Sequence, residues 1–455
     1  MCKTIHSLAY ASVFLLLSPA VVCAASDEAL TWPPKLAGGK KVVTITSPAL
    51  LKPTAEVKPG VKIAKTPPTV NFMYYPGQDY PGNPWSVWGD GLAVGNKYYS
   101  AIGDHKSPEG NAFVYEYDAD TKKLTLVVDL RKTLRRPKGH YTPGKIHSRL
   151  DRGRDGWLYF STHRGSTRVA FDPGAHFKGD WILRYHPEKK KTEIVAAAPL
   201  PMQCMPCGML DPDRLIFYAG TADGLNEKKP QFLAYDIAGR KILYTDAHGP
   251  SRYLIFARST GKVYFHGGTS SPSKTEGPAA LVRFDPEKPG RPVPIAARCG
   301  LRSATMETPD GRVYTIDHDA LWEFDTKTEK ATPLGAAAVG SATYTTSIDA
   351  DPTGRYLYYV PGAHGRAYRD GTPVVQYDVK TRTRKVIAFL HPLLYGKYGY
   401  IPIGTFGSAV SPDGNKLYVT WNGNRGTKKE NLDKRVRFNT CAMTVIHIPS
   451  SERNP

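Results

Sequence analysis

Five histidines recur at one position of a repeated sequence pattern, at or just after the end of a predicted strand. They are His105, His163, His266, His318 and His364. A second group of basic and phenolic side chains stands near the start of other predicted strands: His147, Arg149, Arg252, Tyr253, Arg302 and Tyr344. A neutral imidazole or a phenolate accepts a proton, and a guanidinium holds a carboxylate through two parallel hydrogen bonds. These residue types predict a basic, titratable site for an anionic ligand.

Carboxylates are sparse at the same strand positions. Only Asp90, Asp151, Glu307 and Asp349 are expected there. Hydrolysis of glycosides ordinarily needs two facing carboxylates, and no convincing pair is present. The sequence also has no GxSxG nucleophile turn and no glycine-rich phosphate loop. The pattern therefore disfavours a glycosidase, a serine hydrolase and a nucleotide-binding enzyme.

The segment QCMPCGM places Cys204 and Cys207 at CxxC spacing. With a histidine such as His266 or His318 these thiols could bind a structural zinc ion, although a single CxxC is a poor zinc signature. A structural calcium ion is the other metal considered, and the site requires no cofactor. Cys204, Cys207, Cys299 and Cys441 have three disulfide pairings, and free thiols fit the same spacing.

The elements that must position these residues form a repeat. Seven strands rich in aromatic and β-branched residues each follow a polar or glycine turn, starting near Asn96, Gly156, Asp213, Gly261, Gly311, Gly354 and Gly414. After six of them comes a polar loop, a second strand that resembles "hxxYD" and a charged turn, and the segment TVIHIPS follows the last. An all-strand repeat of this length is typical of four-stranded propeller blades. The sequence predicts an all-β, seven-bladed β-propeller, with six or eight blades as alternatives.

The N-terminal region differs in composition from the repeats. Residues 1–24 have the order of a secretory signal peptide, with Lys3, an apolar run from Leu8 to Val22 and small residues before a cleavage point at Ala24 or Ala25. We expect a proline-rich extended arm or linker at 25–83, in which KVVTIT (41–46) could form an edge strand, a propeller at 84–449 and a tail at 450–455. The predicted location is secreted or periplasmic, with no membrane anchor.

The chain carries 61 basic and 41 acidic residues, a formal net charge of +20. A field of this sign attracts polyanions. Nucleic acid is the usual partner of so basic a chain, but export favours an acidic glycan or an anionic cell envelope instead. We expect a monomer that binds an anionic polysaccharide and no nucleic acid, and a basic protein with no polyanionic partner is the alternative.

Two segments resemble blades of ulvan-lyase-type propellers, which cleave a sulfated, uronate-rich algal polysaccharide. They are GKIHSRLDRGRDGWLYFSTHRGS (144–166) and, more loosely, GPSRYLIFARSTGKVYFHGG (249–268). The resemblance covers the predicted propeller and implies seven blades with a His/Tyr/Arg site.

The resemblance also implies roles for individual residues. His147 and His163 correspond to the active-site histidines of that family, and Arg252 to the arginine that neutralises the substrate carboxylate. Tyr235 and Tyr253 are candidates for the catalytic tyrosine, and Tyr244 is a rival. The remaining residues are predicted to bind substrate: His105, Arg149, His266, Arg302, His318, Tyr344 and His364.

These observations predict a secreted polysaccharide lyase that cleaves an anionic, uronate-containing, ulvan-like polysaccharide by β-elimination. Two other functions stay open. One is a non-catalytic propeller that binds a glycan or a protein. The other is a metal-dependent hydrolase or an oxidoreductase on the same fold.

Overall fold

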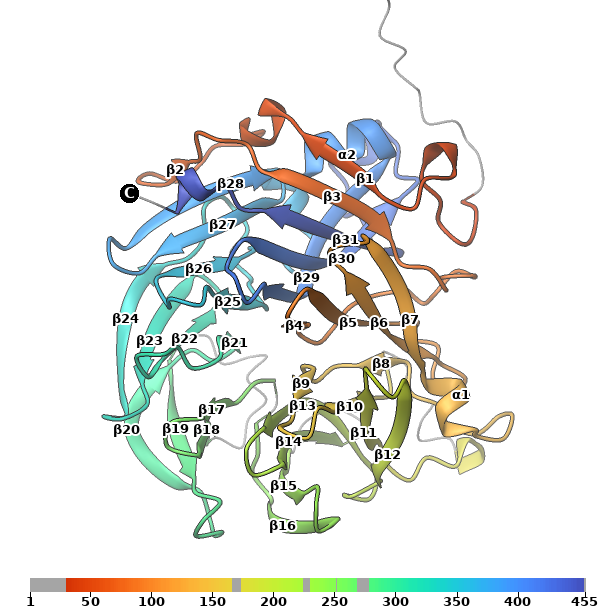
Figure 1. Cartoon of the computed structure of the whole chain (residues 1–455), viewed down its shortest axis with the longest axis vertical. Helices are drawn as coiled ribbons and strands as arrows, with labels where there is room; N and C mark the ends of the chain where they lie inside the picture. Colours follow the sequence, from red (N-terminus) through yellow and green to blue (C-terminus); the bar gives the residue numbers. More distant parts are fainter. Residues whose placement is uncertain (1–29, 166–172, 224–229, 251, 268–277, 454–455) are drawn as a thin grey trace, which may run out of the picture.

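Seven sheets of four or five strands stand around a common axis in the computed structural model of the chain (Figure 1). The structure describes residues 30–165, 173–223, 230–250, 252–267 and 278–453. The predicted seven-bladed β-propeller is therefore confirmed. The predicted signal peptide lies outside the described residues. No helix among the described residues is long and apolar enough to cross a membrane.

Blades 1 to 4 follow one another along the chain, each running from the axis outward. Blade 1 contains β4 (Leu92–Val94), β5 (Lys97–Gly103), β6 (Ala112–Asp118) and β7 (Lys123–Asp129). Blade 2 contains the two short inner strands β8 (Lys145–Ile146) and β9 (Asp151–Arg152), then β10 (Leu158–His163), β11 (Trp181–His186) and β12 (Lys191–Ala197). Blade 3 contains β13 (Gln203–Asp211), β14 (Ile216–Asp223), β15 (Phe232–Asp236) and β16 (Lys241–Asp246). Blade 4 contains β17 (Ile255–Ala257), β18 (Lys262–His266), β19 (Ala279–Phe284) and β20 (Val293–Cys299).

Blades 5 to 7 complete the ring, and the last two also take strands from the N-terminal region. Blade 5 contains β21 (Ser303–Ala304), β22 (Arg312–Asp317), β23 (Ala320–Asp325) and β24 (Lys330–Ala336). Blade 6 contains β25 (Ile348–Ala350), β26 (Tyr356–Tyr359), β27 (Pro373–Asp378), β28 (Thr383–Phe389) and the parallel edge strand β2 (Lys62–Ile63). Blade 7 contains β29 (Tyr400–Val410), β30 (Lys416–Arg425), β31 (Thr440–His447), β3 (Thr69–Tyr74) and the edge strand β1 (Val43–Thr46).

The N-terminal segment closes the ring. Strand β3 pairs antiparallel with the C-terminal strand β31 along its whole length, and four of its six residues are buried. The arm predicted at 25–83 thus supplies strands to two blades, because TVNFMY between its prolines has the apolar content of a blade strand. The predicted tail is also held, since Glu452 accepts hydrogen bonds from the backbone N–H groups of Lys65 and Thr66 at 2.7 and 2.8 Å.

Helices contribute little to the described part of the chain. The α-helices are α1 (Leu130–Leu134) after blade 1 and α2 (His391–Tyr398) after blade 6. Short 3-10 turns occupy the connections: η1 (Ala37–Gly39), η2 (Pro48–Leu51), η4 (Pro173–Ala175), η6 (Ala367–Asp370), η7 (Lys429–Asn431) and η8 (Ser450–Glu452).

The aspartate of the "YD" pattern organises the turn between the third and fourth strands. The Oδ1 atom of Asp118 accepts the backbone N–H groups of Asp120 and Thr121 at 3.0 and 2.9 Å. The chain then passes through a left-handed residue, Lys122 at φ 54°, before the fourth strand begins. Asp325 makes the same pair of bonds. Short side chains that bond to nearby backbone N–H groups favour such turns, which explains the recurrence of the pattern.

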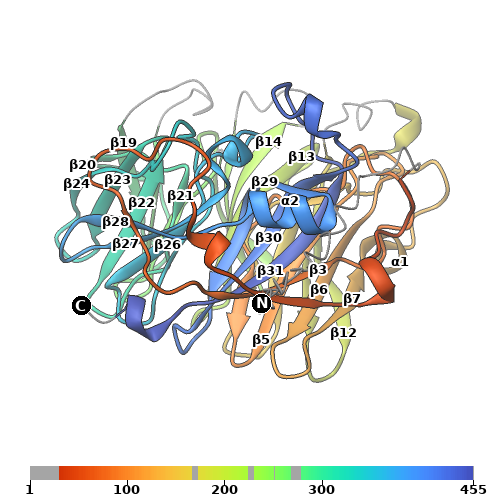
Figure 2. The same ribbon diagram turned by 90° about the horizontal axis from the view of Figure 1, so that it is seen from above.

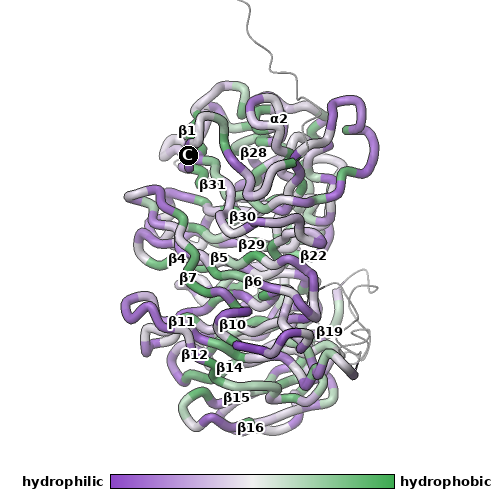
Figure 3. Tube along the Cα trace, turned by 90° about the vertical axis from the view of Figure 1, so that its right-hand side faces the viewer, coloured by the Kyte–Doolittle hydropathy of each residue, from purple (hydrophilic) through white to green (hydrophobic). Residues whose placement is uncertain are grey.

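The core lies between adjacent blades. Tyr98 of blade 1 stacks on Tyr418 of blade 7 with ring centroids 4.9 Å apart, and Phe232 of blade 3 stacks on Phe265 of blade 4 at the same separation. Figure 3 shows apolar stretches along the strands and polar stretches at many of the turns. Because neighbouring blades interlock, the strand ends nearest the axis are held in fixed positions.

The second strands of the blades all end at one edge of the ring. Figure 2 shows this edge from the side, with the turn η7 between β30 and β31 rising above it. The residues that end each second strand, together with those that start each inner strand, are therefore brought to one end of the axis.

Candidate functional site

A cavity of about 490 Å³ lies at this end of the axis. Its lining is Trp88, Lys145, His147, His163, Arg164, Gly165, Arg252, Leu301, Arg302, Asp317, His318, Tyr344 and His364. Four of these side chains are basic besides the histidines, and Asp317 is the one acid among the described lining residues. The predicted basic rim is thus assembled from blades 2, 4, 5 and 6 around one space.

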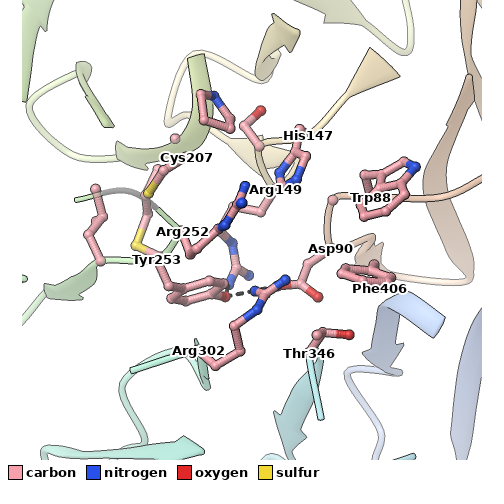
Figure 4. A pocket seen from close by; sticks show the side chains of 16 residues that line it. Trp88, Asp90, His147, Arg149, Cys207, Arg252, Tyr253, Arg302, Thr346 and Phe406 are labelled. Atoms are coloured by element: carbon pink, nitrogen blue, oxygen red, sulfur yellow. Dashed lines mark hydrogen bonds between the residues drawn. The ribbon is translucent and has the colours of Figure 1, made fainter. Parts of the chain in front are cut away.

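A second and much smaller cavity, of about 20 Å³, shares part of this lining (Figure 4). The shared residues are Trp88, His147, Arg252 and Arg302. Gly89, Asp90, Arg149, Cys207, Tyr253 and Phe406 are among its other walls. A space of this size holds about one water molecule, so the larger cavity is the one that can hold a sugar.

Trp88 is the aromatic centre of the site. Its ring lies 5.8 Å from His147, 5.8 Å from His364 and 4.5 Å from Phe406, measured between ring centroids. The Lys145 ammonium lies 3.9 Å from the same ring centroid. Sequence reasoning missed Trp88, because it precedes the first strand of blade 1 and carries no titratable group. Its place three residues after Trp85, in the segment PWSVWGD, was the available signal.

His147 and His163 lie side by side, with ring centroids 5.6 Å apart. Burial, together with the nearby positive charges of Lys145 and other basic groups, lowers the pKa of His147 well below its ordinary value. His147 is therefore neutral at neutral pH. The backbone N–H of Gly165 donates to Nδ1 of His163 at 3.1 Å, so the neutral form of His163 carries its proton on Nε2.

Arg302 and Tyr344 form a hydrogen-bonded pair on the opposite wall. Nε of Arg302 donates to the Tyr344 hydroxyl oxygen at 2.6 Å, and the guanidinium lies 5.4 Å from the centroids of the Tyr344 and Phe406 rings. Because that oxygen already accepts a hydrogen bond, the Tyr344 hydroxyl proton can point to a ligand. Arg252 approaches the same space from the other side of Tyr253 (Figure 4).

Charged partners hold the Tyr253 side chain in the wall of the smaller cavity. Nη1 of Arg149 donates to its hydroxyl oxygen at 2.9 Å, and that oxygen also lies 2.9 Å from Oδ2 of Asp90. Burial first, and then the charge of Asp90, raise the pKa of Tyr253 well above its ordinary value. Arg149 is itself paired with Asp151 at 2.9 Å. Tyr253 and Arg149 are therefore bonded to each other and to buried acids, and this network supports the site.

Two buried acids complete the network. Ser347 donates to Oδ1 of Asp90 at 2.7 Å, and Ser408 donates to Oδ2 of Asp349 at 2.5 Å. Burial first, and then the negative charge of the neighbouring Asp90, raise the pKa of Asp349 to about 7. The pKa of Asp90 is also raised by burial, although Arg149 opposes this. At neutral pH the two carboxyl groups together therefore carry less than two negative charges.

The predicted site residues His105, His266 and Tyr235 are among those that lie outside both cavities. His105 accepts a hydrogen bond from Nε1 of Trp88 at 2.6 Å and so orients that ring from behind. His266 contacts the Cys299 carbonyl oxygen at 2.9 Å. Tyr235 is buried in the core between blades 2 and 3, where the "YD" pattern places it on a third strand. His318 does line the large cavity, with Nδ1 2.8 Å from Asp317.

The four described cysteines are free and buried. Burial raises the pKa of Cys207 to about 12 and that of Cys204 well above its ordinary value, so both are thiols at neutral pH. Within the described ranges, no group of three or more His, Cys, Asp or Glu side chains is placed to hold a metal ion. The predicted set of Cys204, Cys207 and His266 is not brought together, because His266 is turned to the Cys299 backbone.

Comparisons with known proteins support the fold alone. No protein-family model and no curated protein sequence matches the chain. Among solved structures it is similar to an oligogalacturonate lyase in complex with manganese, with 12% identity, 91% of this chain and 100% of that chain covered and a TM-score of 0.51. An oligogalacturonate lyase from Vibrio parahaemolyticus (10% identity, 90% and 100% covered, TM-score 0.47) and the WD40 repeats of RRP9 (8% identity, 87% and 100% covered, TM-score 0.48) are further neighbours. The chain shares with its neighbours the fold of a β-propeller.

Proposed function

We propose that the protein is a secreted or periplasmic polysaccharide lyase that cleaves an anionic, uronate-containing, ulvan-like polysaccharide by β-elimination. One observation carries the proposal. The large cavity combines three arginines and a lysine with neutral imidazoles and a phenol whose oxygen is already hydrogen-bonded, while its one described acid, Asp317, contacts His318. Elimination from a uronate requires a group that neutralises the carboxylate, a base and an acid, and this set can supply all three.

The first requirement is to neutralise the substrate carboxylate. The proton next to a carboxylate becomes acidic only when the negative charge that develops on the carboxylate oxygens is stabilised. Arg252 and Arg302 reach one space from two sides (Figure 4), and guanidinium groups bind carboxylates through paired hydrogen bonds. We assign the carboxylate to these two arginines.

The second requirement is a base. His147 is neutral, and nearby cations are part of the reason its pKa is low. A bound carboxylate offsets those positive charges, so substrate binding raises the pKa of His147 and makes it a stronger base when it is needed. His147 then takes the proton from the carbon next to the carboxylate.

The third requirement is an acid for the leaving group. As the carbon–proton bond breaks, its electrons form the carbon–carbon double bond, and the adjacent bond to the glycosidic oxygen breaks. The Tyr344 hydroxyl, held by Arg302, gives that oxygen its proton. His163, with its proton on Nε2, holds a sugar hydroxyl beside His147.

Ultraviolet absorbance tests the proposal, because the elimination product carries a double bond conjugated to its carboxylate. Purified protein should generate this absorbance from ulvan or another uronate polymer, and His147→Ala should lower turnover about a hundredfold while the fold is kept. Since arginines supply the positive charge, a chelator should leave the rate unchanged. If the unmutated protein cleaves none of these polymers, the proposal fails and a glycan-binding role replaces it.

A further inference from the structure

A third cavity, of about 270 Å³, adjoins the large one through a shared wall. It is lined by His364, Gly365, Arg366, Tyr368, Arg369 and Arg435, and we call it the arginine pocket. His364 also lines the large cavity, where its ring stacks on Tyr344 with centroids 4.9 Å apart. A ligand that extends past His364 would therefore leave one cavity and enter the other.

Hydrogen bonds join the walls of the arginine pocket. The Tyr368 hydroxyl donates to the Lys434 carbonyl oxygen at 2.9 Å, and Nη2 of Arg369 donates to the Asp433 carbonyl oxygen at 2.8 Å. Tyr368 belongs to an apolar cluster that includes Val436. These contacts join the turn η6 of blade 6 to the β30–β31 connection of blade 7, so the two sides of the pocket are preorganised.

The charged side chains that line the described part of the pocket are all positive. Three guanidinium groups line it, and no acidic side chain does among the described residues. Asp370 stands next to Arg369 in the sequence, but its carboxylate accepts hydrogen bonds from Ser341 Oγ and Ala342 N, both at 2.7 Å. The Arg366 and Arg435 side chains are exposed to solvent. Uncompensated arginines facing one small space are the usual recognition element for sulfate, phosphate and carboxylate groups.

We propose that the arginine pocket is a subsite for a second anionic group of the same polysaccharide, a sulfate ester or a carboxylate on a sugar unit next to the one that is cleaved. This inference rests on the proposed function for the identity of the polymer. It assigns Arg366 and Arg435 to substrate binding at a distance from the reacting atoms, so they act on affinity and leave the chemical step unchanged.

The test is a double variant, Arg366→Ala with Arg435→Ala, which leaves the contacts of Tyr368 and Arg369 in place. The matched control is Arg291→Ala, an exposed arginine in the β19–β20 turn of blade 4. With sulfated polymer, the double variant should raise KM and the equilibrium dissociation constant about tenfold with kcat unchanged, and the control should change neither. Equal affinity of the double variant and the unmutated protein would overturn the subsite.

A desulfated polymer identifies the occupant. If a sulfate ester occupies the pocket, the desulfated polymer should bind the unmutated protein about tenfold more weakly, and the double variant should cause no further loss. If the desulfated polymer binds as well as before and still depends on the two arginines, the occupant is a carboxylate. Equilibrium binding is measured separately from cleavage, so loss of the lyase proposal and loss of the subsite give different results.

Discussion

At the scale of single residues, Arg252 has the most direct part in the proposed reaction, because it lines both cavities of the site and is assigned to the substrate carboxylate. Arg252→Ala should lower kcat/KM on a uronate polymer by about 10²–10³, the usual effect of removing one donor to a developing oxyanion. Arg252→Lys should recover part of the loss, because an ammonium supplies charge without the planar fork.

The control for this prediction is Arg291→Ala, which removes the same charge from an exposed turn on another part of blade 4. Circular dichroism should be unchanged in all three variants. Cleavage by Arg252→Ala at the rate of the unmutated protein would show that another group neutralises the carboxylate.

Some site residues could be predicted from the sequence, and others could not. The pattern located His147, Arg252 and Arg302 near the starts of inner strands and His163 at the end of a second strand, and these do share a cavity. The sequence offered Tyr253, with Tyr235 and the rival Tyr244, as the catalytic tyrosine and placed Tyr344 among the substrate-binding residues, although Tyr253 and Tyr344 both stand near the start of an inner strand. Only the side-chain contacts separate them: Tyr253 is tied to Asp90 and Arg149, whereas Tyr344 faces the large cavity.

At the scale of elements, the inner strands support the site through Asp349 on β25. Burial and Asp90 raise its pKa from about 3.8 to about 7. The folded protein therefore holds a proton that the unfolded chain has released above pH 4. Because the folded state binds more protons in this range, Asp349 makes the free energy of unfolding fall as pH rises from about 4 to about 7.

Asp349→Asn should remove this contribution and keep an oxygen acceptor for Ser408. In denaturant titrations at several pH values, the variant should gain stability relative to the unmutated protein as pH rises through this window. Asp79→Asn, at an exposed position, is the control and should show no such trend. A constant difference between Asp349→Asn and the unmutated protein at every pH would mean that Asp349 is ionised throughout.

Strand and turn patterns were the most predictable level of structure. The aspartate of the "YD" pattern accepts hydrogen bonds from the backbone of its own turn. The turn can therefore be predicted from a few neighbouring residues, without knowledge of the fold. The ring-closing strand β3 was harder to place, because its pairing with β31 joins residues more than three hundred positions apart. Prolines on both sides of it also favoured an extended arm.

At the scale of the whole molecule, closure of seven blades converts scattered residues into one site. Blades 2, 4, 5 and 6 each deliver basic or aromatic side chains to the cavity, which no single segment could do. The number of blades followed from counting the repeat. The volume of the cavity, the central place of Trp88 and the arginine pocket depend on how side chains pack across blades, and a linear pattern does not contain that information.

The central claim is that the protein breaks the glycosidic bond by elimination. The direct test is cleavage of a uronate polymer in water enriched in heavy oxygen, followed by mass spectrometry of the fragments. Elimination should give fragments with an unsaturated terminal uronate, one water lighter than hydrolysis products, and should introduce no heavy oxygen at the broken bond. Saturated fragments that carry one heavy oxygen per cleavage would contradict the account and identify the protein as a hydrolase.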